Sequence, residues 1–273
     1  MIFRAITGFR LVASDPARLA AFYRAIGFDV GEAAPIPAAE MELLGLPGAG
    51  WRIAMSLGQS CVDLERFDLP GDPYPDDAAS CDLVFQHLAL VTDDAEAAWR
   101  RACEAGATPI SRGRPVTLPQ SAGRVAAVKF RDPEGHPLEF LQFPPGDNPD
   151  WKGSGVIGID HSAISVSDVA ASRRFYAQHG LSEADATVNH GPTQDALDGL
   201  DRAEVDVVPM IPADRPPHVE MLGYRHPIGR ALRPLSPNDI AATRIVWRSD
   251  SNGLIRDPDG HLHQLTRSIS SRY

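Results

Sequence analysis

The sequence is poor in cysteine, in basic residues and in long hydrophobic runs, and each shortage excludes a class of protein. Its three cysteines lie far apart without a CxxC pair, which disfavours a disulfide framework or a thiolate metal site and fits a reducing cytoplasm. The 26 basic residues are outnumbered by 36 acidic ones, and a net charge of −10 disfavours nucleic acid and anionic lipid as partners. No apolar run approaches the ~18 residues of a membrane span, and the N-terminus lacks the apolar core of a signal peptide. We therefore expect a soluble, cytoplasmic protein with no membrane or nucleic-acid partner.

The composition is that of a globular chain. Apolar residues make up 43% of the sequence and charged residues 23%, which suffices for a core and excludes a largely disordered protein. At ~100 to 200 residues per domain, 273 residues correspond to one large domain or two ordinary ones. The oligomeric state is left open, and a homodimer is compatible with the sequence.

A pattern of aspartate and glycine recurs three times. Asp15, Asp94 and Asp168 each end an apolar run, and a glycine follows each of them twelve residues later. An aspartate can cap the start of a helix by accepting backbone N–H bonds, and glycine suits the left-handed position that ends one. The spacing therefore predicts three helices of about three turns each.

Strand-like runs surround each predicted helix. One run precedes the helix and about three follow it, so the repeated module is strand, helix, then strands. A fourth copy begins at Thr243–Arg248 and reaches Asp250, but the turn at Asn252 and Gly253 leaves no room for a helix. We expect an α+β fold in which residues 238–266 contribute strands only.

A linker is predicted where turn-forming residues interrupt the modules, at Pro144–Asp150. It divides the chain into a first domain at 1–143, a linker at 144–155 and a second domain at 156–273. Each half would hold two modules. In the second half, one module would be complete and the other would lack its helix.

Histidine and acidic residues recur at matching positions of the modules. The residue seven before each aspartate is Gly8, His87, His161 and Thr243 in the four copies. Alignment of the last strands places Asp63, Glu139, Glu220 and Gln264 together. The two middle modules thus each offer one imidazole and one carboxylate, the donors that divalent cations such as Zn²⁺, Ni²⁺, Mn²⁺ and Fe²⁺ accept.

Two further motifs contain histidine but favour a structural interpretation. Asp132–His136 and Asp257–His261 share the pattern Asp-Pro-acid-Gly-His, and Asp-Pro followed by Gly is typical of tight turns. We expect both to form hairpin turns.

Three stretches of the chain resemble the vicinal oxygen chelate superfamily, which includes glyoxalase I, bleomycin-resistance proteins and extradiol dioxygenases. They are HLALVTDDAEAAW with RDPEGHPLEFLQF, IDHSAISVSDVAASRRFYAQHGL with VEMLGY, and ITGFRLVASDPARLAAFYRAIGF. The resemblance implies βαβββ modules paired into cupped eight-stranded mixed sheets, with metal ligands on the first and last strands. Those positions are His87, Glu139, His161 and Glu220, an order similar to that of bacterial glyoxalase I. The segment 189–194 would then lie at the mouth of a cup, where it could contact substrate.

The pairing of the modules decides whether these ligands meet. If modules two and three share a sheet, all four residues converge on one ion. If modules one and two pair instead, the candidate ligands fall into two separate groups. One cup would hold Asp63, His87 and Glu139, and the other would hold His161, Glu220 and Gln264. The sequence leaves both arrangements open.

The resemblance implies a metal-dependent enzyme of glyoxalase type, a lyase or isomerase acting on a small substrate with two adjacent oxygens. It would hold one divalent cation, Zn²⁺, Ni²⁺, Mn²⁺ or Fe²⁺, with Glu139 or Glu220 as general base. An Fe(II) extradiol dioxygenase is an alternative, which Thr243 and Gln264 disfavour at two expected ligand positions. A metal-free protein that binds a drug or metabolite is the other alternative.

Overall fold

The computed structural model describes residues 1–147, 151–214 and 216–267. Its helices are α1 (Pro16–Ala25), α2 (Ala38–Leu44), α3 (Ala95–Glu104), α4 (Val169–Gln178) and α5 (Pro192–Asp198), with a 3₁₀ turn at Gln120–Ala122. Its strands are β1 (Ala5–Val12), β2 (Asp29–Pro35), β3 (Gly50–Leu57), β4 (Ser60–Phe67), β5 (Gln86–Thr92), β6 (Thr108–Pro109), β7 (Val116–Thr117), β8 (Ala126–Arg131), β9 (Pro137–Gln142), β10 (Val156–Ser165), β11 (Ser182–Glu183), β12 (Thr187–His190), β13 (Glu204–Ile211), β14 (His218–His226), β15 (Arg244–Ser249), β16 (Gly253–Arg256) and β17 (Leu262–Arg267). The fold is α+β, as predicted.

Three helices begin at the predicted aspartates. The carboxylates of Asp15, Asp94 and Asp168 each accept the backbone N–H three residues later, over 2.9 to 3.1 Å. The glycines that follow, Gly27 and its two counterparts, have φ between +94° and +114°, where an L side chain would be strained. The cap and the stop at each end therefore confirm the helix boundaries read from the sequence.

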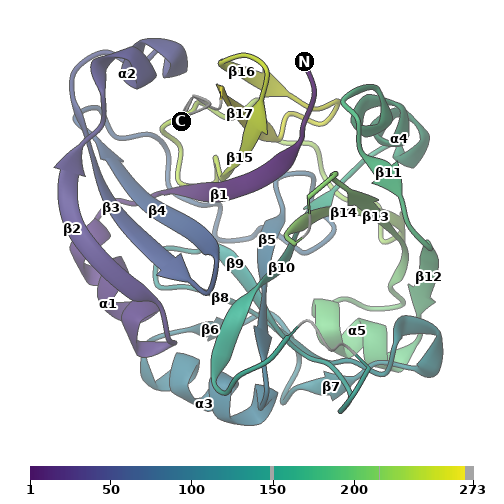
Figure 1. Ribbon diagram of the computed structural model, residues 1–273. Helices are drawn as coiled ribbons and strands as arrows, with labels where there is room; N and C mark the ends of the chain where they lie inside the picture. Colours follow the sequence, from purple (N-terminus) through teal and green to yellow (C-terminus); the bar gives the residue numbers. More distant parts are fainter. Residues whose placement is uncertain (148–150, 215, 268–273) are drawn as a thin grey trace.

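The strands form two curled sheets, which Figure 1 shows with β2 and β12 at opposite sides of the molecule. The first sheet has the order β16-β17-β15-β1-β4-β3-β2. The second has the order β11-β13-β14-β10-β5-β9-β8-β6, with β12 beside β13 and β7 beside β8. The expected cupped mixed sheets are thus present, but with seven and ten strands in place of eight. Modules two and three each have two short strands, β6 with β7 and β11 with β12, where one is expected, and module four supplies only β15, β16 and β17.

The pairing follows one of the two arrangements left open by the sequence. Modules two and three share the second sheet through their first strands, β5 and β10, and modules one and four share the first sheet through β1 and β15. Both sheets therefore draw strands from either side of the predicted linker at 144–155 and do not coincide with the halves 1–143 and 156–273. Residues 148–150 of that linker lie outside the described residues.

The fourth module has no helix, as predicted. Residues 238–266, all of them described, contain β15, β16 and β17 joined by turns. No helix within the described ranges is long and apolar enough to cross a membrane.

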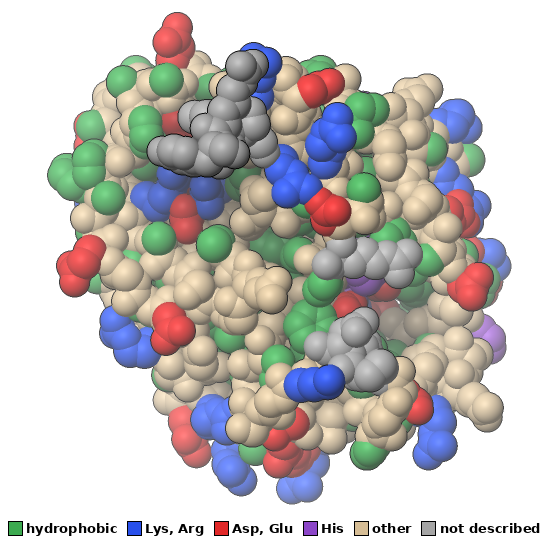
Figure 2. All heavy atoms as spheres, in the orientation of Figure 1, with side chains coloured by type: hydrophobic (Ala, Val, Ile, Leu, Met, Phe, Trp, Pro, Cys, Tyr) green, Lys and Arg blue, Asp and Glu red, His purple; other side chains and the backbone are tan. Residues whose placement is uncertain are grey.

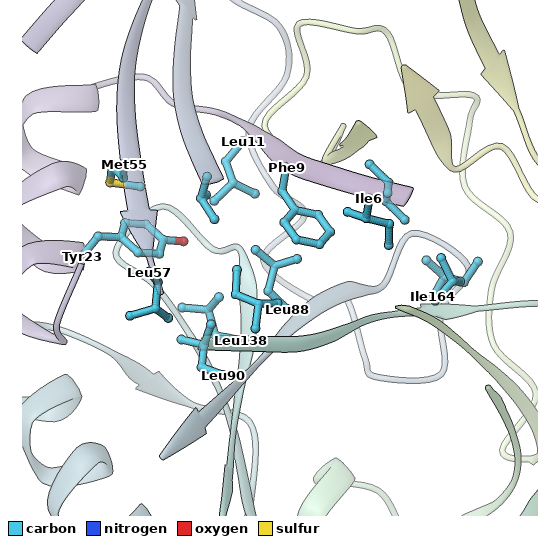
Figure 3. Packing of buried hydrophobic residues seen from close by; sticks show 14 of the residues in the cluster. Ile6, Phe9, Leu11, Tyr23, Met55, Leu57, Leu88, Leu90, Leu138 and Ile164 are labelled. Atoms are coloured by element: carbon cyan, nitrogen blue, oxygen red, sulfur yellow. The ribbon is translucent and has the colours of Figure 1, made fainter. Parts of the chain in front are cut away.

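The main hydrophobic core lies between the two sheets. Figure 3 shows Phe9 and Leu11 of β1 facing Leu88 and Leu90 of β5, and all four side chains are almost completely buried. Helices α1, α3 and α4 contribute to the same core. The faces of the sheets that point away from this core are free to carry polar side chains.

The two predicted hairpin turns join the sheets. In the turn Asp132–His136, the Asp132 carboxylate accepts the hydroxyl of Tyr23 over 3.0 Å, and His136 Nε2 lies 3.0 Å from the carbonyl oxygen of Val12 in the first sheet. In the turn Asp257–His261, Asp257 accepts the hydroxyl of a helix tyrosine in the same way. The structural interpretation of both motifs is confirmed.

Candidate metal centre

Strand register places the four predicted ligands on one face of the second sheet. Glu139 of β9 lies opposite Ala89 of β5, two residues after His87, and Glu220 of β14 holds the same relation to β10 and His161. Residues two apart on a strand project from the same face. The antiparallel pairing of β5 with β10 then brings the two histidines together, with ring centroids 5.7 Å apart.

The donor atoms of three of these residues form a compact group. His87 Nε2 lies 2.8 Å from Glu139 Oε2, and His161 Nε2 lies 4.0 Å from the same oxygen. Glu220 lies beside the group, with its Oε1 3.6 Å from His161 Nε2. Donor atoms that bind one ion at ~2.1 Å are ~3.0 Å apart when adjacent and ~4.2 Å apart when opposite, so these separations suit a single cation.

The hydrogen bonding of His161 also suits a metal ligand. Its Nδ1 lies 2.9 Å from Asp160 Oδ2, while its buried Nε2 has no hydrogen-bond partner among the described residues. A histidine that binds a metal through one nitrogen usually donates the other N–H to a carboxylate. Asp160 also forms a second acidic and imidazole group with His161 and His218, whose donor atoms lie within 4.8 Å of one another.

The charges of the ligand side chains follow from burial and from their neighbours. Burial lowers the pKa of His87 to about 4, which Glu139 only partly offsets, so this imidazole is neutral at pH 7. Burial would raise the pKa of Glu139, but Lys129 and His87 lower it to about 2. Burial would lower the pKa of His161, but the carboxylates of Glu220 and Asp160 raise it to about 9. The carboxylates that favour a proton on His161 also favour a divalent cation bound to the imidazole in place of that proton.

A buried ion pair lies beside this group. Lys129 of β8 is opposite Glu139 in the sheet, and its Nζ donates to Asp198 Oδ1 at the end of α5 over 2.7 Å. The hydroxyl of Ser111 accepts the backbone N–H of Lys129 and donates to the carbonyl oxygen of Leu197. These bonds fix α5, which belongs to module three, on the strands of module two.

A cavity of about 330 Å³ lies over the same face of the sheet. Its polar lining includes Glu139, Asp160, His161, Asp185, Thr187, Asn189, Gln194, His218 and Glu220, and its apolar lining includes Leu118, Val125, Leu141, Phe143, Leu197 and Val207. Figure 2 shows a hollow between the positions of β10 and β12, with histidine and acidic side chains visible inside. Such a site can hold a small molecule with a polar end at the histidines and an apolar body against the leucines and valines.

Sequence comparison identifies the family. The family model for the Glyoxalase/Bleomycin resistance protein/Dioxygenase superfamily matches residues 5–140. The chain belongs to this superfamily.

Solved structures show the fold of the superfamily along the whole chain. Glyoxalase I from Zea mays superposes with a TM-score of 0.60 and 14% identity, covering 97% of this chain and 92% of that one. A putative dioxygenase from Bacillus subtilis superposes with a TM-score of 0.56 and 13% identity, covering 98% and 86%. At these identities the likeness is one of fold. No curated protein matches the sequence significantly.

In this member of the superfamily, the residues of the alternative split sites lie on different sheets. Asp63 belongs to the first sheet, where it contacts Arg10 Nη1 at 2.6 Å, and Gln264 lies there as well, donating to Glu40 Oε1 over 2.7 Å. Neither can join a ligand of the second sheet. The pairing excludes both split sites.

One aligned position of the first sheet was wrong by a residue. Arg244, not Thr243, corresponds to His161, because Arg244 lies opposite Arg10 as His161 lies opposite Ala89. The missing helix shortens the fourth module, so counting back from its aspartate gives the wrong register. Arg244 is buried against Glu65, and its guanidinium occupies the cup where a ligand histidine would stand.

Sequence reasoning missed several residues of the candidate site. Asp160 and His218 were not considered, although one adjoins a predicted ligand and the other lies two residues before Glu220 on the same strand face. Lys129 and Asp198 carry no local motif. The segment 189–194 does reach the cavity, since Asn189 and Gln194 line it, but it is the end of a strand and the start of a helix.

Proposed function

We propose that the chain is a metal-dependent enzyme of glyoxalase type, a lyase or isomerase that acts on a small substrate with two adjacent oxygens. The observation that supports this most directly is the group of His87, Glu139 and His161 with Glu220 beside it, beneath a cavity of about 330 Å³. A bound divalent cation would supply Lewis acidity that polarises a carbonyl and favours loss of a proton from the neighbouring carbon.

The four side chains would have two kinds of role. His87 and His161 would hold the cation, with Asp160 fixing the ring of His161 through its Nδ1. Glu139 and Glu220 are the carboxylates available as general bases. Glu220 is the better placed, since its side chain is 18% exposed at the cavity wall and that of Glu139 is 6% exposed and bonded to His87.

The first test is metal content. We expect about one Zn²⁺, Ni²⁺, Mn²⁺ or Fe²⁺ per chain after reconstitution and removal of free metal. Content near zero with all four metals would refute the proposal, and a metal-free protein that binds small molecules would be the surviving interpretation.

The second test is proton abstraction. The metal-loaded protein should catalyse exchange of the C–H protons of hydroxyacetone with D₂O, followed by NMR. Glu220→Gln should reduce the exchange rate ~100-fold or more, which is the contribution typical of a general base. Glu183→Gln, at an exposed carboxylate on β11, serves as the matched control and should leave the rate unchanged.

An Fe(II) ring-cleaving dioxygenase is the second candidate, and one observation favours it. His87, His161 and Glu139 are the two-histidine, one-carboxylate set found in non-haem iron oxygenases. The objection raised by Gln264 falls away, because that residue lies on the other sheet. Consumption of O₂ with catechol by the Fe²⁺-loaded protein, with no exchange of hydroxyacetone protons, would favour this candidate over the first.

A further inference from the structure

Gln194 presents a hydrogen-bonding atom that the protein itself does not use. Its side chain lies at the cavity wall on α5 and is only 4% exposed. Its Oε1 is buried and has no partner among the described residues. A buried acceptor left unpaired is costly, so such an atom on a residue that lines a cavity points to a ligand that supplies the missing donor.

The orientation of this amide is fixed by its neighbours. Gln194 Nε2 donates to Asp198 Oδ2 over 2.7 Å, and the other oxygen of Asp198 accepts Lys129 Nζ, also over 2.7 Å. An ionised carboxylate can only accept hydrogen bonds, so the NH₂ group must face Asp198 and the carbonyl oxygen must face away. Position 194 therefore offers an acceptor and not a donor.

The first sheet shows where a side chain at this position reaches. Helices α2 and α5 are both seven residues long and end at a left-handed glycine, five residues after Glu40 and Gln194 respectively. Glu40 Oε1 accepts Nε2 of Gln264 on the last strand of the partner module, so Gln264 corresponds to Glu139 when α2 is matched with α5. In the first sheet the side chains of Glu40 and Gln264 are hydrogen-bonded to each other, whereas in the second sheet the two corresponding residues line a cavity.

We propose that Gln194 Oε1 accepts a hydrogen bond from the substrate, and that the substrate therefore carries a hydroxyl or N–H donor in addition to its two adjacent oxygens. This inference rests on the proposed function, which places the two oxygens at His87, Glu139 and His161. Lys129 and Asp198 are positioning residues, since they act by fixing the amide of Gln194.

The test compares three catechols of similar size as probes of the Zn²⁺-loaded protein, with dissociation constants from calorimetry. 4-(Hydroxymethyl)catechol carries a donor, 4-ethylcatechol replaces the hydroxyl by methyl, and 3,4-dihydroxybenzaldehyde carries only an acceptor at that end. The dissociation constants of the corresponding 3-substituted catechols are measured as well. For each substituent, the isomer that binds more tightly is used in the comparison. We expect the hydroxymethyl probe to bind roughly 10- to 100-fold more tightly than the other two.

Variants assign the preference to one side chain. Gln194→Met keeps the length of the side chain and should bring the three dissociation constants within about twofold of one another. Thr187→Val is the matched control at another polar residue of the cavity, whose hydroxyl already donates to Asn189, and it should keep the preference. The ratio of two ligands is measured within each variant, so a general loss of stability does not imitate the result.

Every other outcome has a defined meaning. Equal affinities in the unaltered protein, a preference that survives Gln194→Met, or no binding of any probe would overturn the inference while leaving a metal-loaded site intact. Failure to take up Zn²⁺ would instead count against the proposed function, and the same ratio measured on the metal-free protein would then decide this inference alone.

Discussion

Replacing His87 by alanine should weaken binding of a divalent cation about 100- to 1,000-fold, whereas His218→Ala should change it less than about threefold. The structure contains two groups of donor atoms that share His161, one with His87 and Glu139 and the other with Asp160 and His218. His161→Ala damages both groups and cannot tell them apart. The contrast between the other two histidines can.

The magnitude follows from dividing the binding energy among the ligands. A structural Zn²⁺ site of four ligands contributes ~10 to 16 kcal/mol, or ~2.5 to 4 kcal/mol per ligand. At ~1.36 kcal/mol per factor of ten, loss of one ligand corresponds to roughly 10² to 10³ in affinity. Because the donor atoms of His87 and His161 lie within 4.8 Å of each other, the double alanine variant should lose less than the sum of the single losses.

The assay is competition for Zn²⁺ with a chromophoric chelator, and thermal melting without metal serves as the control for folding. A stoichiometry of one ion per chain is expected. If His218→Ala weakens binding as much as His87→Ala, or if the two single losses at His87 and His161 simply add, the single-site reasoning is refuted.

Three further predictions concern stability. Burial lowers the pKa of His136, but the Asp132 carboxylate outweighs it and raises that pKa above its usual value. The charge on His136 therefore stabilises the fold fully below about pH 6.5, and this contribution is lost as the pH rises through the raised pKa. His136→Gln should accordingly lower the free energy of unfolding more at pH 6 than at pH 9, measured by urea unfolding. Lys129→Met should lower the free energy of unfolding by about 3 to 5 kcal/mol by leaving the Asp198 carboxylate buried and unpaired, and adding Asp198→Leu should recover most of the loss; an equally unstable double variant would contradict this. Gly229→Ala should cost more than about 2 kcal/mol, because its Cβ would lie 1.7 Å from a backbone carbonyl oxygen; an unchanged melting temperature would show that the segment can move aside.

The repeated spacing allowed the helices and the ligand positions to be predicted, because both depend on local sequence. A capping aspartate and a stop glycine act within one helix, and the histidines seven residues before Asp94 and Asp168 have the same place in their modules. The matching strand positions of His87 and His161 could therefore be predicted from the sequence alone, and their role as ligands stays a prediction. The fourth module broke the rule, and the assignment of Thr243 failed with it.

The pairing of modules could not be predicted, because every module offers the same edge to a partner. Each first strand can pair with any other first strand, so nothing within a module selects its partner. In the structure, the long connections at residues 68–85 and 227–243 lie against each other. The backbone N–H of Asp72 donates to Asp239, and that of Leu83 donates to the carbonyl oxygen of Arg230. Contacts between residues so far apart in the chain leave no periodic signal.

The residues that complete the site were missed for a related reason. Lys129 would read as a surface residue from its type alone, and only the approach of α5 supplies the buried partner Asp198. The side-chain amide of Gln194 has a fixed orientation only when Asp198 and Lys129 are paired. The chemistry of a polar side chain here depends on a neighbour almost seventy residues away.

The nested order of the two sheets has a consequence for synthesis on the ribosome. Every strand of the second sheet is encoded between Gln86 and His226, whereas the first sheet needs both β1 and the last three strands of the chain. Once His226 has left the ribosome, the sheet that carries the candidate metal ligands has all its strands. At that stage β15, which pairs with β1, has not yet emerged. Since domains fold as units when their chain becomes available, the connectivity lets the ligand-bearing sheet form first and the first sheet close around a finished neighbour.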